Sequence, residues 1–405
     1  MKFAADFHIH SKFSRATAKN LDLEHLHISA QLKGITVLGT GDFTHPAWFS
    51  EIKEKLESTD NGLFKLKDHL AAPLDRTVPP ICRRAVSLMQ VSELSNIYKK
   101  HGKTRKNHNL VFLPDLETAE KFNSKLDKIG NIKSDGRPIL GLDSRDLLEI
   151  LLETTPEAYL VPAHIWTPWF SMLGSKAGFD SVKACFEDLT PHVFALETGL
   201  SSDPAMNRRV SFLDNLTLIS NSDAHSPSKL GREANLFNME PSFDGIRSAL
   251  MDGDKRRFLG TIEFYPEEGK YHLDGHRKCR VRLWPETTLE QAGLCPVCEK
   301  PVTLGVLHRV EELADRKEGD QPKQTRPFYR RIPLVEVLSE IFRVGPATKT
   351  VEKAYWSLIE KLGPELDILQ NLPLGALEDT GIPLFNEAIK RARQNSVHIL
   401  PGYDG

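Results

Sequence analysis

The sequence predicts an α/β fold for residues 1–250, followed by a small cysteine-containing module and a helical C-terminal region. Short apolar runs alternate with longer amphipathic stretches in the first part, as in a parallel sheet or barrel covered by helices. Three of the five cysteines cluster between residues 279 and 298. After residue 328 the apolar side chains recur with a helical period.

The predicted strands are short runs of β-branched and aromatic residues bounded by Gly, Pro, Asp or Asn. They are residues 35–38, 110–113, 158–161, 193–196 and 216–219. Helical periodicity is typical of residues 21–32, 145–152, 334–342, 347–362 and 384–393. We therefore divide the chain into an α/β domain (1–250), a cysteine-containing module (255–315) and a helical domain (325–405). Residues 46–85 interrupt the alternation and predict an insertion that forms a lid or loop over the barrel mouth.

Composition places the chain among ordinary globular proteins. It has 405 residues, 40% hydrophobic and 27% charged, with a net charge of −2. No apolar run approaches the roughly 20 residues of a membrane helix, and the N-terminus lacks the apolar core of a secretory signal. A cytoplasmic location without a membrane partner is expected. Because the net charge is near zero, a nucleic-acid surface would have to be local.

Polar side chains follow most of the predicted strands at their carboxyl ends. These ends open on one face of an α/β barrel, so residues far apart in the sequence converge there. The residues concerned are His8, His10, Asp42, His164, Glu197, Asp223 and His225, and Glu93 and His108 add further ligand types. A single residue of this kind is usually structural. The recurrence predicts a metal cluster.

The spacing and type of these residues predict phosphoester hydrolysis. His8 and His10 lie on one side of an extended strand, and Asp223 and His225 repeat their spacing. Imidazole and carboxylate ligands suit Zn²⁺, Mn²⁺ or Fe. Neighbouring metal ions lower the pKa of bound water towards about 7 and stabilise an in-line phosphoryl displacement. The sequence has no Gly-rich phosphate loop and no clear catalytic Cys, in agreement with a water nucleophile.

The order of these motifs resembles the polymerase-and-histidinol-phosphatase (PHP) domain over roughly residues 1–240. The resemblance implies a distorted (β/α)7 barrel with two or three Zn²⁺, Mn²⁺ or Mg²⁺ ions. It implies a first ion bound by His8, His10, Glu93 and Asp223, and a second bound by Glu93, His108 and His164. A third ion would be bound by Asp42, His225 and a bridging Asp223. We assign the catalytic roles to Asp223, Glu93 and His10.

Two departures from the family pattern put the third ion in doubt. Phe43 follows Asp42 where the family often has a histidine, and Arg15 stands near the place of another histidine. Arg15 could instead contact a substrate phosphate. Glu197 is open to two interpretations, a partner of the site or an ordinary surface-loop residue.

A second cluster predicts a structural zinc site. His276, Cys279, Cys295 and Cys298 form HxxC and CxxC pairs, the ligand set and spacing of a four-coordinate zinc module. His272 is an alternative to His276. Further on, residues 342–351 resemble the hairpin of a helix-hairpin-helix element, and a plain loop between packed helices is the alternative.

The whole chain resembles the endonuclease Q family. The resemblance is carried by FHIHSKFSRAT, VSELSNIYKKHGKTRKNHNLVF, NSDAHSPSKLGREAN, EFYPEEGKYHLDGHRKC and CPVCEKPVTLGVLHRVEELADR. It implies an enzyme that nicks DNA on the 5′ side of deaminated bases, such as hypoxanthine and uracil, and at abasic sites. DNA carrying such lesions is therefore the expected partner, and a sliding clamp is a further candidate partner.

Substrate contacts are expected near the metal ligands, because a flipped lesion must reach them. The candidates are Arg15, Lys103, Arg105, Lys106, Trp166, Trp169, Phe170, Glu197 and Arg232. For the aromatic residues, a cover over the barrel mouth is an equal alternative. Two rival functions share the same residues. A small-molecule phosphomonoesterase would not explain the zinc module, and a non-catalytic DNA-binding protein would hold metal at that module alone.

Overall fold

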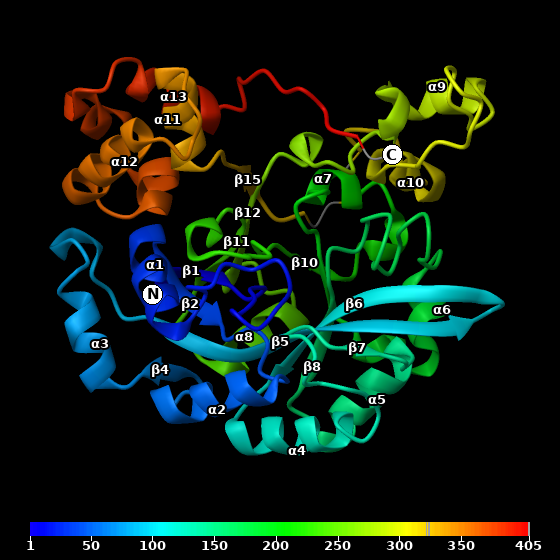
Figure 1. Cartoon of the computed structure of the whole chain (residues 1–405), viewed down its shortest axis with the longest axis horizontal. Helices are drawn as coiled ribbons and strands as arrows, with labels where there is room; N and C mark the ends of the chain where they lie inside the picture. The colour runs from blue at the N-terminus through cyan, green and yellow to red at the C-terminus, as the bar shows by residue number, and fades with distance from the viewer. Residues whose placement is uncertain (321, 323–324, 404–405) are drawn as a thin grey trace.

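Alternating strands and helices form the first two thirds of the chain in a computed structural model that describes residues 1–320, 322 and 325–403 (Figure 1). Residues 404 and 405 of the predicted helical domain lie outside the described residues. The strands are β1 (Lys2–Asp6), β2 (Ile35–Gly39), β3 (Leu56–Ser58), β4 (Phe64–Leu66), β5 (Ser87–Lys100), β6 (Lys103–Leu113), β7 (Ile139–Leu140), β8 (Tyr159–Pro162), β9 (Ala195–Glu197), β10 (Thr217–Ile219), β11 (Ala234–Asn238), β12 (Phe258–Glu263), β13 (Asp274–His276), β14 (Val281–Leu283) and β15 (Phe328–Arg330).

Helices flank these strands and form most of the C-terminal region. They are α1 (Leu23–Lys33), α2 (Pro46–Lys55), α3 (Asp68–Asp75), α4 (Leu116–Leu126), α5 (Ser144–Thr154), α6 (Val182–Phe186), α7 (Pro204–Asn207), α8 (Phe243–Met251), α9 (Pro285–Glu290), α10 (Val306–Leu313), α11 (Leu334–Phe342), α12 (Lys349–Leu362) and α13 (Phe385–Arg393). The five predicted helices are confirmed as α1, α5, α11, α12 and α13, and no end differs from its predicted position by more than two residues. Over the described ranges, no helix has the length and apolar character needed to cross a membrane.

Eleven of the described strands form one large mixed sheet, and β9–β10 and β13–β14 form two separate pairs. The order of the large sheet is β15-β12-β11-β1-β2-β5-β4-β3, with β6 paired to β5 and β8 paired to β6. β1, β2 and β5 are parallel neighbours, whereas β11 and β6 run antiparallel to theirs. Successive residues of β1 alternate between two apolar clusters, with Ala4 in one and Phe3 and Ala5 in the other. Both faces of the sheet are therefore buried.

The closed (β/α)7 barrel expected from the PHP resemblance is not present as a continuous ladder in the described part of the chain. β9 and β10 pair only with each other. The gap on one side is spanned by a hydrogen bond from Ile165 N to Glu197 O, at 3.2 Å. On the other side, an isolated bridge joins Ile9 to Ala224. The strand ends still converge, although the ring of hydrogen bonds is broken.

A long hairpin of β5 and β6 replaces the parallel unit that the sequence pattern predicts here. Its turn consists of His101 and Gly102, which both have positive φ, 51° and 71°. This is the two-residue turn geometry that suits a twisted hairpin. As a result, Glu93 and His108 lie inside the paired strands rather than at strand ends.

Residues 56–82 extend the edge of the sheet. β3 and β4 form a hairpin that meets β5 through Phe64 and Leu88. Val78 and Cys82 belong to the same apolar cluster as α11, α12 and α13. The segment was expected to cover the barrel mouth as a lid or loop. Its contacts instead place it beside the C-terminal helices.

The C-terminal region packs onto α1 and returns to the zinc-binding segment. In Figure 1, α11 to α13 lie above α1, and the chain beyond α13 crosses towards α10. This tail is held by hydrogen bonds from Gly402 N to Glu267 O, at 2.8 Å, and from Leu273 N to Gly402 O, at 3.0 Å. Within the segment 342–351, residues 343–348 form the turn between α11 and α12, and the two ends belong to these helices.

A buried ion pair connects α1 to the C-terminal helices. Lys33 Nζ lies 2.5 Å from Glu365 Oε2, and both side chains are less than one tenth exposed. The Glu365 carboxylate also accepts hydrogen bonds from Tyr355 Oη at 3.0 Å and from Leu334 N at 3.0 Å. Three segments of the chain therefore converge on one carboxylate.

We predict that Glu365→Ala lowers the free energy of unfolding by about 3–5 kcal/mol, because it leaves Lys33 buried without a counter-charge. Urea denaturation measures this loss. The control is Lys229→Ala, which removes an exposed pair with Glu336 at 3.8 Å and should cost less than about 1 kcal/mol. Equal losses in the two variants would contradict the assignment.

Candidate metal centre

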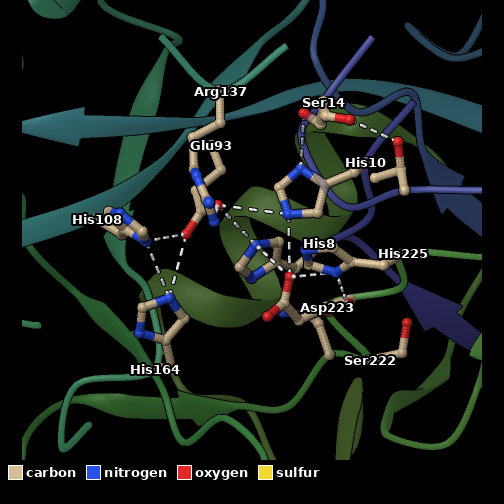
Figure 2. Close-up of polar contacts among 12 residues, drawn as sticks. His8, His10, Ser14, Glu93, His108, Arg137, His164, Ser222, Asp223 and His225 are labelled. Carbon is tan, nitrogen blue, oxygen red and sulfur yellow. Dashed lines mark hydrogen bonds and ion pairs between the residues drawn. The ribbon is translucent and has the colours of Figure 1, made fainter. Parts of the chain in front are cut away.

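Imidazole and carboxylate side chains from widely separated strands meet at one place (Figure 2). His8, His10, Glu93 and Asp223 bring ligand atoms within 4.8 Å of one another, and so do Glu93, His108 and His164. Glu93 belongs to both groups. Most of these side chains are buried, but the Asp223 side chain is 28% exposed. Asp223 therefore lies on the side of the centre that a substrate can reach.

Glu93 divides its two carboxylate oxygens between the groups. Oε2 lies 3.5 Å from Nε2 of both His8 and His10. Oε1 lies 2.7 Å from His108 Nδ1 and 3.1 Å from His164 Nε2. Asp223 Oδ1 completes the first group, 3.0 Å from His10 Nε2. A carboxylate placed in this way could offer one oxygen to each of two metal ions.

Three residues at strand ends adopt an unusual backbone conformation. Asp42, His164 and Asp223 each have positive φ, 42°, 29° and 47°. Non-glycine residues rarely adopt this region, and such strain is concentrated at functional sites. Gly199 packs so closely on His164 that an added Cβ would collide with the histidine.

Buried carboxylates orient His8 and His10 by contacting Nδ1, the ring nitrogen that faces away from the proposed metal. Glu197 lies with both oxygens 3.0 Å from His8 Nδ1, and it accepts a hydrogen bond from His164 N at 2.8 Å. Asp42 Oδ1 lies 3.2 Å from His10 Nδ1. A carboxylate on one ring nitrogen directs the lone pair of the other nitrogen towards a metal. Glu197 is buried, so the surface-loop interpretation of this residue is wrong.

The charges of the centre favour a bound cation. Burial alone would raise the pKa of Glu93, but His108 and Arg137 hold that pKa well below its ordinary value. Burial would lower the pKa of His10, yet hydrogen bonds to Asp223 and Asp42 raise it to about 9. The centre thus retains its negative carboxylates and attracts positive charge. Metal ions would compete with protons for the same imidazoles.

A buried nitrogen without a hydrogen-bond partner is a further sign of a metal site. His8 Nε2 is buried and has no hydrogen-bond partner in the described part of the chain. Leaving such an atom unsatisfied is costly, and a metal ion at the first group would satisfy it. His8, His10, Glu93 and Asp223 would hold one ion, and Glu93, His108 and His164 a second.

The third predicted site is not assembled in this way. Asp42 Oδ2 accepts hydrogen bonds from Ser11 N at 2.6 Å and Ser14 Oγ at 2.8 Å. Its other oxygen faces His10. His225 lies near the backbone of Asp223, with 2.9 Å from Nδ1 to the carbonyl oxygen. Within the described ranges, Asp42 and His225 belong to neither group of converging ligands.

Arg137 is a residue of the centre that sequence reasoning missed. Its Nη1 donates to Glu93 Oε2 at 2.9 Å, and Figure 2 shows it reaching the centre beside the two histidine groups. It lies in the loop just before β7 and does not follow the carboxyl end of a strand, so the pattern that located the other site residues could not identify it.

The candidate substrate residues divide into two sets. Lys106 Nζ lies 5.3 Å from the Phe170 ring and 5.9 Å from the Trp169 ring, and Phe170 lies 4.8 Å from His108. Trp169 is 45% exposed. Lys103 is exposed at the hairpin tip. Lys106, Trp169 and Phe170 form a cationic and aromatic wall beside the second group.

The remaining candidates have structural partners. Trp166 is fully buried and donates to Asn207 Oδ1 at 2.8 Å, so it does not line a substrate surface. Arg105 is buried, with its guanidinium 4.1 Å from the Phe179 ring. Arg232 donates to Ser222 O at 2.9 Å and supports the loop that carries Asp223. Arg15 pairs with Asp135 at 3.1 Å.

The predicted zinc ligands also converge. The ligand atoms of His276, Cys279, Cys295 and Cys298 lie within 4.8 Å of one another, and His276 Nδ1 is 3.5 Å from Cys298 Sγ. The alternative ligand His272 is buried outside this group. β13 and β14 pair antiparallel and place Cys279 in the turn between them. The role of the four residues as zinc ligands stays a prediction.

Sequence comparisons find one relative that is much longer than this chain and one of similar length. A family model described as the MJ0043 C-terminal domain matches residues 333–396. The chain is 35% identical over 248 residues to uncharacterized protein MJ0043 of Methanocaldococcus jannaschii, covering 59% of this chain but only 30% of that protein. It is 30% identical over 418 residues to uncharacterized protein YqxK of Bacillus subtilis, covering 100% of this chain and 98% of that protein.

Two solved structures share the fold over nearly the whole chain. The lesion-specific endonuclease PfuEndoQ from Pyrococcus furiosus has a TM-score of 0.85 and 29% identity, covering 99% of this chain and 93% of that one. A structure of endonuclease Q with a 27-mer duplex substrate, carrying an abasic lesion at the active site, has a TM-score of 0.85 and 28% identity. That match covers 99% of this chain and 94% of the other.

We predict that Cys295→Ala removes one bound metal equivalent and makes residues 274–305 sensitive to protease, because a closed four-ligand site contributes directly to local folding. Elemental analysis and limited proteolysis measure the two effects. Cys82→Ala is the matched control, since Cys82 is also a buried thiol but lies far from the four ligands in sequence. Unchanged metal content in the Cys295 variant would refute the zinc assignment.

Proposed function

Because the chain belongs to the endonuclease Q family, we propose that it is a metal-dependent DNA repair endonuclease. The proposed reaction is hydrolysis of the phosphodiester on the 5′ side of deaminated bases, hypoxanthine and uracil, and at abasic sites. One observation carries the proposal: Glu93 shares its two oxygens between two groups of candidate metal ligands. Such a centre suits phosphoester hydrolysis by water.

The protein groups have distinct parts in this chemistry. Ions of Zn²⁺, Mn²⁺ or Mg²⁺ bound at the centre would supply an activated water and neutralise charge on the phosphate. Glu197 and Asp42 hold His8 and His10 in the orientation that presents Nε2. Glu93 and Asp223 stay ionised, because neighbouring histidines lower the pKa of each despite burial.

The wall formed by Lys106, Trp169 and Phe170 supports a nucleic-acid substrate. An exposed indole offers a stacking face to any base, and the ammonium group of Lys106 suits a phosphate. We propose that Trp169 and Phe170 contact the lesion nucleotide or its neighbour, and that Lys106 contacts the backbone. The zinc-binding segment and the turn between α11 and α12 are proposed to contact the flanking duplex.

Nicking assays test the proposed activity. End-labelled duplexes that carry inosine, uracil or an abasic site should be cut on the 5′ side of the lesion with Mg²⁺ or Mn²⁺, and chelator should abolish the cut. Asp223→Ala should lower the rate by more than about 100-fold. Loss of a residue that only supports a metal ligand already costs about 10- to 100-fold, and Asp223 is itself a proposed ligand.

Asp60→Ala is the control, because Asp60 is an exposed carboxylate of a surface turn. Hydrolysis of a chromogenic phosphomonoester without nicking would favour the phosphomonoesterase alternative. Metal at the zinc module alone would favour the non-catalytic alternative.

We predict that Trp169→Ala weakens binding to a lesion duplex by about 5- to 150-fold, since stacking contributes about 1–3 kcal/mol per base. Fluorescence anisotropy with Ca²⁺ in place of the active metal measures this. Trp356→Ala is the matched control, because Trp356 is also exposed, at 37%, but lies within α12 rather than in a segment proposed to contact DNA. Equal losses in both variants would exclude a specific role for Trp169.

A further inference from the structure

We infer that Arg137 contacts the scissile phosphate and supplies the positive charge that a third metal ion would otherwise bring. This inference rests on the proposed phosphodiester hydrolysis and names a further group for it. Arginine suits the role because its planar guanidinium binds phosphate oxygens through several fixed N–H groups. It stays charged at any pH at which the enzyme works.

The position of the guanidinium is the first support. Nη1 lies 2.9 Å from Glu93 Oε2, the same oxygen that faces His8 and His10. The Arg137 side chain is 28% exposed, whereas Glu93 is fully enclosed. Arg137 thus spans the distance from the bridging carboxylate to solvent. Glu93 is the one side chain to which its guanidinium is hydrogen-bonded in the described part of the chain, so its other N–H donors are available to a substrate.

The loop that carries Arg137 is held in place on both sides. Gly136 N donates to Phe13 O at 3.0 Å, and Arg137 N donates to Asp135 Oδ1 at 3.1 Å. A Cβ at position 136 would collide with the Asp42 carboxylate and with Ser14 Oγ, so only glycine permits this approach. Such constraints fix the guanidinium before substrate arrives, which is what electrostatic stabilisation of a transition state requires.

The same contacts leave Asp42 with little capacity for a metal ion. Each of its oxygens already accepts hydrogen bonds, from His10, Ser11 and Ser14. The Arg137 loop covers it further, because Gly136 packs directly on this carboxylate. A third ion would have to break these bonds, whereas Arg137 brings a permanent charge to the adjoining space. Arg15 is a poorer candidate, since its side chain is 77% exposed and paired with Asp135.

The test compares Arg137→Ala, Arg137→Lys and Arg15→Ala with the unaltered full-length protein. Bound metal is counted by elemental analysis, and kcat and KM are measured on an abasic duplex and on bis(p-nitrophenyl) phosphate. We expect two metal equivalents at the centre and one at the zinc module in every protein. Arg137→Ala should lower kcat by about 10²–10³-fold, as loss of one transition-state donor does, and Arg137→Lys should recover part of it.

Binding gives a second readout that a purely structural role would not move. With Ca²⁺, the unaltered protein should prefer a duplex with the natural scissile phosphate to one with an uncharged methylphosphonate at that position. Arg137→Ala should lose most of this preference. Arg256→Ala, which removes a 90% exposed guanidinium elsewhere, should retain it.

Three results would overturn the inference: a third metal equivalent at the centre, loss of metal in Arg137→Ala, or an unchanged phosphate preference in that variant. A larger effect in Arg15→Ala would transfer the role to Arg15. Failure of the unaltered protein to nick any lesion duplex would instead refute the proposed function. In that case the metal count and the small diester still test Arg137.

Discussion

The buried carboxylate of Glu93 is the constraint on which the rest of the centre depends. Its two oxygens face different pairs of imidazoles, and the Arg137 guanidinium donates a hydrogen bond to one of the two oxygens, Oε2. A buried anion of this kind is tolerated only where positive charge surrounds it. The five basic side chains around Glu93 meet that requirement, and their positions are set in turn by the hairpin, the strand ends and the loop before β7.

The surrounding structure stabilises this charged centre with further polar groups rather than with apolar ones. Glu197 connects His8 to the backbone of His164 and to Asn221. Asp42 connects His10 to the loop that contains Ser11 and Ser14. A buried network is stable when each member has its partners. In this network His8 Nε2 has no hydrogen-bond partner, and a metal ion bound there would satisfy it.

Sequence patterns predicted the elements well where the signal was local. Apolar runs located β2, β6, β8 and β10, and the endonuclease Q resemblance is confirmed by two structures that match nearly the whole chain. The prediction of a closed barrel was wrong, because β9 and β10 pair only with each other in the described part of the chain. The β5–β6 hairpin was missed, because its His101–Gly102 turn lies in a charged stretch that resembles a solvated surface. The contact of Arg137 with Glu93 and the burial of Trp166 depend on tertiary packing, which produces no periodic pattern in the sequence. The metal-binding roles of the eight predicted active-site ligands remain predictions.

The β5–β6 hairpin also has a consequence for how the centre assembles during folding. Its two-residue turn brings Glu93 and His108 together through a contact that is local in the chain. Hairpins of this kind form in about 1–10 μs. His10 and Asp223, by contrast, are 213 residues apart in sequence and meet only when β1 and β11 have joined. One half of the centre can therefore form early, while the other half must await closure of the chain, the slower kind of event.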